Sequence, residues 1–230
     1  MKKIFAFILI TAGILSLASC ITSLQPLVTY DKIITNNQIL GNWTREGDEF
    51  LVEPMHSNEL AEALGNISGN NEKPSGLTGD PIKDSILISK AYVITYEREG
   101  VKYYMAAALM KLGNNLFMDI HPGIMNDSKA SEDYKDPFTF NNDYLAGFTI
   151  AKVNITANAI TLQFVDGEFV KQQIKAGRMK LKHESNELFG TFVITASTQE
   201  LRSFLEKYGN DPRIFHKETT ITLTRKPGTT

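Results

Sequence analysis

Two side chains that commonly bind metal ions lie two residues apart near the middle of the chain. Asp119 and His121 end a β-branched and aromatic stretch, and alternate residues of a strand share one face. Residues 127–136 then carry four carboxylates that could complete a ligand set for a divalent cation. A metal-assisted hydrolase is therefore one hypothesis. The competing interpretation is a strand end with solvated acids, which the lack of an EF-hand spacing or a His-Glu-x-x-His sequence favours.

Other catalytic patterns are absent from the sequence. A nucleophile elbow needs Gly-x-Ser-x-Gly, and the nearest stretch, residues 65–69, has its serine one position too late. No glycine-rich phosphate-binding sequence precedes an expected helix. We therefore expect a non-enzymatic protein with no catalytic residue, no metal and no other cofactor.

The N-terminal residues have the parts of a secretory signal peptide. Lys2 and Lys3 form a positive start, and residues 4–17 are uncharged and largely apolar. This run is shorter than the ~20 residues that cross a bilayer as a helix. It ends in Leu17-Ala18-Ser19-Cys20, which resembles the lipobox of bacterial lipoproteins. The other interpretation is an ordinary signal peptide followed by a buried free cysteine.

The lipobox resemblance implies that residues 1–19 are removed and that Cys20 carries a diacylglyceryl thioether. Several acyl chains, at ~0.8 kcal/mol for each buried CH₂ group, anchor a protein stably in a membrane. Ile21, and not an aspartate, follows the cysteine, which implies sorting to the outer membrane of a Gram-negative envelope. Because no acidic cluster follows Cys20, we expect the domain to face the periplasm, with the cell surface as the alternative.

Charge and cysteine content narrow the class of the remaining 211 residues. Loss of the two N-terminal lysines changes the formal net charge from −2 to −4, which argues against general affinity for nucleic acid. Cys20 is the only cysteine, so no internal disulfide can form. We expect one domain over residues 26–230, joined to the membrane by a tether of residues 20–25.

The sequence pattern of residues 91–122 predicts the central part of the fold. A β-branched and aromatic run at 92–96 is followed by a glycine turn, and residues 101–112 then contain neither Gly nor Pro. A second turn at 113–115 leads into residues 116–120. Three neighbouring strands joined by tight turns make a meander.

Other segments extend the β pattern on both sides of the meander. Residues 26–34 are expected to form the first strand, and Gly47-Asp48 a hairpin turn. Residues 56–84 are the most polar part of the chain and predict an insertion, with a short helix at 58–64 and a loop at 69–76. Further strands are expected at 144–155, 160–165, 178–182, 188–195 and 219–224.

Two helices are expected after the meander. Residues 168–176 follow Asp166 as a cap, and residues 198–208 follow a capping box made by Ser197 and Glu200. Apolar residues of the second helix lie at i, i+3, i+4 and i+7, which predicts one buried stripe: Leu201, Phe204, Leu205 and Tyr208. The fold class is thus mainly β, an antiparallel meander barrel of about ten strands with two or three short helices.

Gly41-Asn42-Trp43 on the first expected barrel strand resembles the Gly-x-Trp sequence of lipocalin-like barrels. That resemblance implies that Gly41 and Trp43 pack across the closed bottom of the barrel. The stretches 112–113 and 117–120, and the C-terminal residues 200–215, are similar to those of uncharacterised Gram-negative envelope lipoproteins. The chain departs from the lipocalin pattern in its extra length, its 56–84 insertion and its helix at 168–176.

The interior of such a barrel can hold one small ligand or be filled by side chains. The residues expected to point inward are large and aliphatic: Val93, Met105, Leu109, Ile160, Leu162, Phe164, Met179, Leu181, Ile221 and Leu223. Five of these form the candidate apolar pocket: Met105, Leu109, Leu162, Phe164 and Leu181. Packed interiors are the norm, so we expect these side chains to fill the barrel. The alternative is an open cup, whose ligand should be a fatty acid or an isoprenoid.

Two surface features complete the candidate sites. The basic residues Lys171, Lys175, Arg178, Lys180 and Lys182 could meet anionic lipid headgroups or an acidic partner, or form a solvated face. Asp84-Ser85-Ile86 resembles the acceptor site of some periplasmic O-glycosylation systems. The leading hypothesis is a lipid-anchored, non-enzymatic barrel that binds a small apolar molecule or an envelope protein. A metal-assisted hydrolase and a purely structural envelope component are the alternatives.

Overall fold

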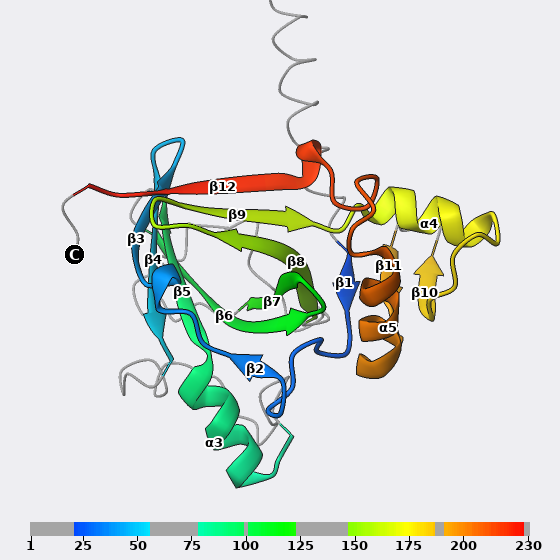
Figure 1. Cartoon of the computed structure of the whole chain (residues 1–230), viewed down its shortest axis with the longest axis horizontal. Helices are drawn as coiled ribbons and strands as arrows, with labels where there is room; N and C mark the ends of the chain where they lie inside the picture. The colour runs from blue at the N-terminus through cyan, green and yellow to red at the C-terminus, as the bar shows by residue number, and fades with distance from the viewer. Residues whose placement is uncertain (1–20, 56–77, 99–100, 123–146, 187–190, 228–230) are drawn as a thin grey trace, which may run out of the picture.

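The computed structural model describes residues 21–55, 78–98, 101–122, 147–186 and 191–227, which form a mainly β protein (Figure 1). The strands are β1 (Thr22–Ser23), β2 (Ile33–Ile34), β3 (Gly41–Arg45), β4 (Asp48–Pro54), β5 (Tyr92–Arg98), β6 (Val101–Leu112), β7 (Asn115–Pro122), β8 (Phe148–Ile155), β9 (Ala159–Phe164), β10 (His183–Asn186), β11 (Thr191–Ile194) and β12 (Thr220–Arg225). The helices are α3 (Pro81–Lys90), α4 (Gly167–Lys175) and α5 (Thr198–Tyr208), with short 3₁₀ turns η2 (Asn37–Ile39) and η4 (Lys217–Thr219).

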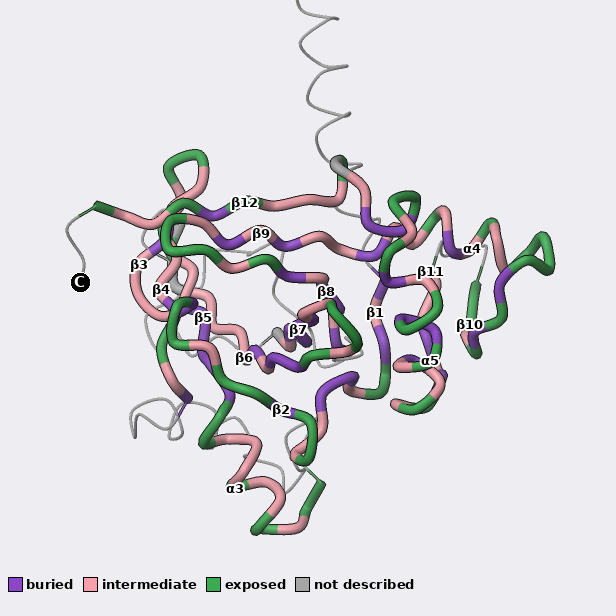
Figure 2. Tube along the Cα trace, viewed as in Figure 1, coloured by how far each residue is buried: buried purple, intermediate pink, exposed green. Residues whose placement is uncertain are grey.

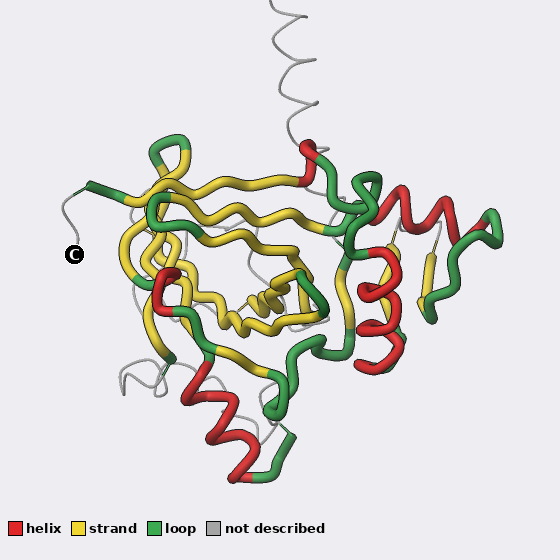
Figure 3. The backbone as a smooth tube through the Cα atoms, viewed as in Figure 1, coloured by secondary structure: helices red, strands yellow, loops and turns green. Residues whose placement is uncertain are grey.

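Eight strands close into an antiparallel barrel. β3 to β9 follow one another as neighbours, and β12 lies between β9 and β3. The pairing of β8 with β9 completes the ring. The predicted meander is therefore confirmed as β5, β6 and β7, and the predicted class, an antiparallel lipocalin-like barrel, is confirmed as well. Figure 3 shows most of the strands gathered in the barrel, with α3, α4 and α5 outside it.

A helical insert, residues 165–219, separates the last two barrel strands. It contains α4, β10, β11, α5 and η4, and it lies on one side of the barrel (Figure 1). Its strand β11 joins the main sheet through β1, which is parallel to β11 and antiparallel to β8. Gly147 permits this junction, because a Cβ atom there would lie 2.1 Å from the Thr22 methyl group.

The N-terminal part of the described chain differs from the expected tether and strand. Thr22–Ser23 form β1 in the sheet and Ile21 is buried, so residues 21–25 belong to the folded domain. The expected strand at 26–34 is wrong except at Ile33–Ile34. The reason is that residues 26–29 bond to side chains of α5 and β7, as described below, and not to a neighbouring strand.

Two apolar cores lie on opposite faces of the barrel sheet. The inner core fills the barrel, and the outer core lies between the sheet, the insert and the N-terminal segment. Val93, Met179 and Leu181 were expected inside the barrel but belong to the outer core. Figure 2 shows buried residues on both the barrel strands and the insert. Because Tyr92, Val93 and Ile94 are all buried, hydrophobicity alone could not tell which face each occupies.

The helices agree with their capping signals. α5 has the predicted bounds and the Ser197–Glu200 capping box, and the Asp166 carboxylate caps α4. α3 was not predicted, although Asp80 caps it and Pro81 occupies its first turn. The expected strand at 178–182 is wrong, because these residues form a connection between α4 and β10. The expected helix at 58–64 and loop at 69–76 lie outside the described residues.

The floor of the barrel is built around Trp43, which is fully buried. Its indole N–H donates to the Ile39 carbonyl oxygen at 2.8 Å, which holds η2 beneath the barrel. The Arg225 guanidinium lies 4.1 Å from the Trp43 ring centre and donates to the Gln38, Leu40 and Ala157 carbonyl oxygens. Gly41 has a φ of +111°, and it leaves room for Arg225 beside the strand.

The packing of α5 predicts the effect of a single truncation. Phe204→Ala should lower the free energy of unfolding by about 3–5 kcal/mol, since Phe204 is 6% exposed in the outer core. Ser203→Ala, on the exposed side of the same helix, should change it by less than about 0.5 kcal/mol. Urea denaturation measures both values. Equal effects for the two variants would mean that α5 does not stabilise the outer core.

Candidate functional site

One end of the barrel presents apolar side chains that remain partly accessible. We call this end the mouth, and define it by six half-buried inward residues: Phe50, Tyr96, Tyr103, Met105, Phe164 and Ile221. Phe50, Tyr96 and Tyr103 form an aromatic row across β4, β5 and β6, with ring centres 4.9 Å and 5.5 Å apart. The register pairs Phe50 with Tyr96 and Tyr96 with Tyr103, so the row follows directly from the strand alignment.

Below the mouth the barrel is filled by its own side chains. Leu109 is fully buried, and Met118 and Ile160 are each 1% exposed. Of the predicted pocket residues, Met105 and Phe164 lie at the mouth, and Leu109 and Leu162 lie in the inner core. Leu181 lies outside the barrel, because the segment that carries it is not a barrel strand. The barrel interior below the mouth is therefore a packed core.

The mouth contains few groups that could orient a polar ligand. The Tyr96 hydroxyl donates to the Asp48 carboxylate at 3.1 Å, which directs that oxygen toward the strand ends. The other half-buried side chains of Met105, Phe164 and Ile221 carry no hydrogen-bonding group stronger than a thioether. Sequence patterns did not single out the aromatic row, since its members are brought together only by the register of three strands.

A separate polar site lies on the outer face, where Asp119 of β7 meets the N-terminal segment. The Val28 N–H donates to Asp119 Oδ2 at 2.7 Å. Asp119 Oδ1 has no hydrogen-bond partner among the described residues, and the side chain is 4% exposed. Burial raises the pKa of Asp119 to about 7, although the nearby Val28 and Leu27 amides and the Arg202 charge favour the ionised form.

Helix α5 holds the same N-terminal segment from the other side. The Arg202 guanidinium donates to the Leu27 carbonyl oxygen and to the Thr29 hydroxyl. The Thr198 hydroxyl donates to the Pro26 carbonyl oxygen at 2.7 Å. Asp119 and α5 thus clamp residues 26–29 against the barrel, which satisfies backbone groups that have no strand partner.

The metal-binding hypothesis placed Asp119 beside His121. They do share one face of β7, and the His121 ring lies 5.1 Å from the Phe148 ring. However, Asp119 is buried against the Val28 amide and not at an open coordination site. No group of three or more His, Cys, Asp or Glu side chains suited to a metal occurs among the described residues. Residues 127–136 lie outside the described part of the chain.

Of the remaining predicted sites, those that the structure describes lie at the periphery. Cys20 lies outside the described residues, and Ser85 is exposed on α3. No helix in the described part of the chain is both long and apolar enough to span a membrane. Of the predicted basic face, Lys171 pairs with Glu168 on α4, whereas three members line one groove: Arg178, Lys180 and Lys182.

The buried carboxyl group predicts a pH-dependent stability. A folded-state pKa of about 7, above the ordinary value of 3.8, means that Asp119 favours folding when protonated. This contribution is present below about pH 4 and is lost as the pH rises through 7. Asp119→Asn keeps an acceptor for the Val28 amide and does not titrate. Its free energy of unfolding should therefore rise relative to the native protein between pH 5 and pH 8, by roughly 2–3 kcal/mol.

Urea denaturation of both proteins at several pH values measures this difference. Glu184→Gln removes an exposed carboxylate on β10 and serves as the control for loss of one negative charge. A constant difference between Asp119→Asn and the native protein from pH 5 to pH 8 would contradict the assignment.

The chain is thus characterised by its barrel topology, by the apolar mouth and by the polar site around Asp119. Comparison with protein-family models, with curated proteins and with solved structures finds no match. The barrel of eight antiparallel strands and the half-buried aromatic row at its mouth are the features on which its functional interpretation rests.

Proposed function

We propose that this protein is a lipid-anchored envelope lipoprotein whose barrel binds a small apolar molecule at its mouth. The observation that carries the proposal is the half-buried aromatic row at one end of a closed barrel. Small-molecule sites are lined mainly by apolar and aromatic side chains, which the mouth supplies. A barrel of eight strands is also of the size that holds one small ligand.

The chemistry of the mouth favours a fatty acid or an isoprenoid. Aromatic and aliphatic surfaces stabilise such ligands by burying apolar area, at about 25 cal/mol for each Å². A sugar or nucleotide would need several convergent hydrogen-bond donors and acceptors. The mouth offers mainly the Tyr96 and Tyr103 hydroxyl groups, and the Tyr96 hydroxyl is already bonded to Asp48. The packed floor limits the ligand to partial insertion.

The anchor part of the proposal rests on the lipobox resemblance at residues 17–20 and on the N-terminal fold. Cleavage before Cys20 would leave Ile21 as the next residue, and Ile21 is buried at 5% exposure beside β1. A lipid on Cys20 would then hold the domain directly against the membrane, without an intervening flexible segment. Outer-membrane sorting and a periplasmic orientation belong to the same proposal.

Ligand binding is tested by filling the mouth. Met105→Trp should reduce binding of a fluorescent fatty acid at least about fivefold, since the larger ring occupies the space beside the aromatic row. Ile82→Trp adds the same ring on α3, where Ile82 is 74% exposed, and should leave binding unchanged. Native mass spectrometry of protein purified from cells should also detect an extractable apolar mass. Equal binding by both variants would exclude the mouth as the site.

The anchor is tested by replacing the cysteine. Cys20→Ala should abolish incorporation of radiolabelled palmitate, because no other thiol exists in the chain to carry the lipid. The variant should move from the membrane fraction to the soluble fraction, or remain as an uncleaved precursor. Fractionation followed by immunodetection measures this change. Absence of label from the native protein would overturn the anchor assignment.

A further inference from the structure

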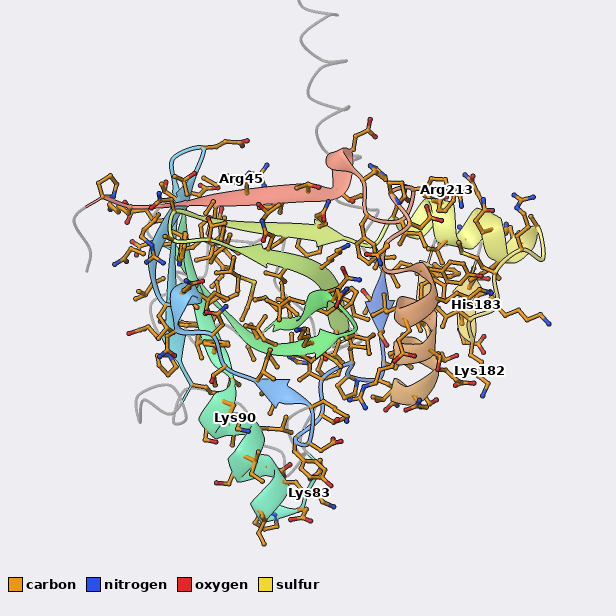
Figure 4. All side chains as sticks on the ribbon, viewed as in Figure 1. Arg45, Lys83, Lys90, Lys182, His183 and Arg213 are labelled. Atoms are coloured by element: carbon orange, nitrogen blue, oxygen red, sulfur yellow. The ribbon has the colours of Figure 1, made fainter. Side chains whose placement is uncertain are left out.

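A groove on the insert combines a cationic rim with an apolar floor. It has a volume of about 960 Å³ and lies between helix α5 and the connection at 177–182. We call it the insert groove. It differs from the mouth in position, since it lies outside the barrel on the side where Figure 4 labels Lys182 and His183. Its lining includes four basic side chains and a single acid: Arg178, Lys180, Lys182, Lys207 and Glu200.

The two walls of the insert groove both carry positive charge. Arg178, Lys180 and Lys182 come from the connection, and Lys207 comes from the last turn of α5. Glu200 neutralises only Lys182, to which it bonds at 2.9 Å, so the other three basic side chains leave the rim positive. Lys180 is exposed, and among the described residues no ion pair is formed by it.

The floor is apolar and lies below this rim. Met179, Leu181 and Phe204 are between 5% and 8% exposed, and the half-buried Tyr208 ring lies beneath the Lys207 ammonium group at 4.9 Å. A flat bilayer surface would reach only the rim and leave the floor uncovered. Membrane-binding surfaces also present exposed apolar side chains. The exposed large apolar residues of the described chain, Leu24, Ile34 and Ile82, do not line this groove.

We infer that the insert groove docks an extended acidic segment of a partner protein. Attraction between the basic rim and the acidic segment would orient the segment and raise its association rate. Apolar side chains of the segment would contact the floor of the groove. Helix α5 has 11 residues and is about 16 Å long, which matches roughly five residues of extended chain. Arg178 is suited to a carboxylate, because its guanidinium is held by Gln173 at 2.7 Å. This inference does not depend on a ligand in the barrel.

Fluorescence anisotropy tests this inference with the full-length protein in neutral phosphatidylcholine nanodiscs. The probe is a labelled eight-residue peptide of alternating aspartate and leucine, and a lysine–leucine peptide is its counterpart. The acidic peptide should bind and the basic one should not. Lys180→Glu and Lys207→Glu should each weaken binding at least about fivefold, and added salt should weaken it further.

Lys90→Glu is the matched control, because Lys90 is an exposed lysine on α3, away from the groove in Figure 4. It should change the affinity by less than about twofold. Lysine-reactivity footprinting by mass spectrometry should show that the acidic peptide protects Lys180 and Lys207 and leaves Lys90 reactive. Absence of binding, or equal weakening by Lys180→Glu and Lys90→Glu, would overturn the inference. Protection of Lys180 by phosphatidylglycerol nanodiscs in the absence of peptide would assign the groove to lipid and overturn it as well.

Discussion

The stacking of Arg225 on Trp43 is the interaction on which barrel closure depends. β12 must pair with β9 on one side and β3 on the other, and Arg225 ends this strand over the floor. A planar guanidinium can stack on an indole ring and donate hydrogen bonds from its edge at the same time, which a lysine cannot do. Its three carbonyl acceptors belong to η2, to the residue before β3 and to the β8–β9 turn. One side chain thus joins β12 to two segments that are far apart in sequence, residues 38–40 and the β8–β9 turn.

A closed floor and a covered outer face give the central strands two buried sides. Residues 26–29 have no neighbouring strand in this arrangement, so side chains from other elements make hydrogen bonds to their backbone N–H and C=O groups. Asp119 and Arg202 do so from opposite sides, at the cost of a buried carboxyl group whose second oxygen has no partner among the described residues. The consequence for function is that the chain enters the fold immediately after the expected lipid-bearing cysteine. A lipid-anchored form would have little freedom to rotate above the membrane.

Local signals predicted the elements whose determinants are local. The capping box and the apolar stripe placed α5 at its observed bounds, and the glycine turns placed β6 between β5 and β7. The predictions failed where tertiary packing, and not local sequence, determines the structure. Met179 and Leu181 alternate with basic residues as in a strand, yet they anchor a connection to the outer core. The aromatic row and the position of Arg225 depend on strand register, which no short sequence motif encodes.

The barrel sheet lies between the two proposed binding surfaces, the mouth and the insert groove. It is a single layer with an apolar core packed on each face. On β7, Met118 points into the barrel while its neighbour Phe117 packs outward against the Phe215 ring at 6.0 Å. Both side chains are almost fully buried, and close-packed interiors resist small displacements because each shift creates voids or overlaps. A ligand that inserts only into the mouth leaves this layer in place. Binding at the mouth and docking in the insert groove should therefore be energetically independent, so one domain could serve both a small molecule and a partner protein.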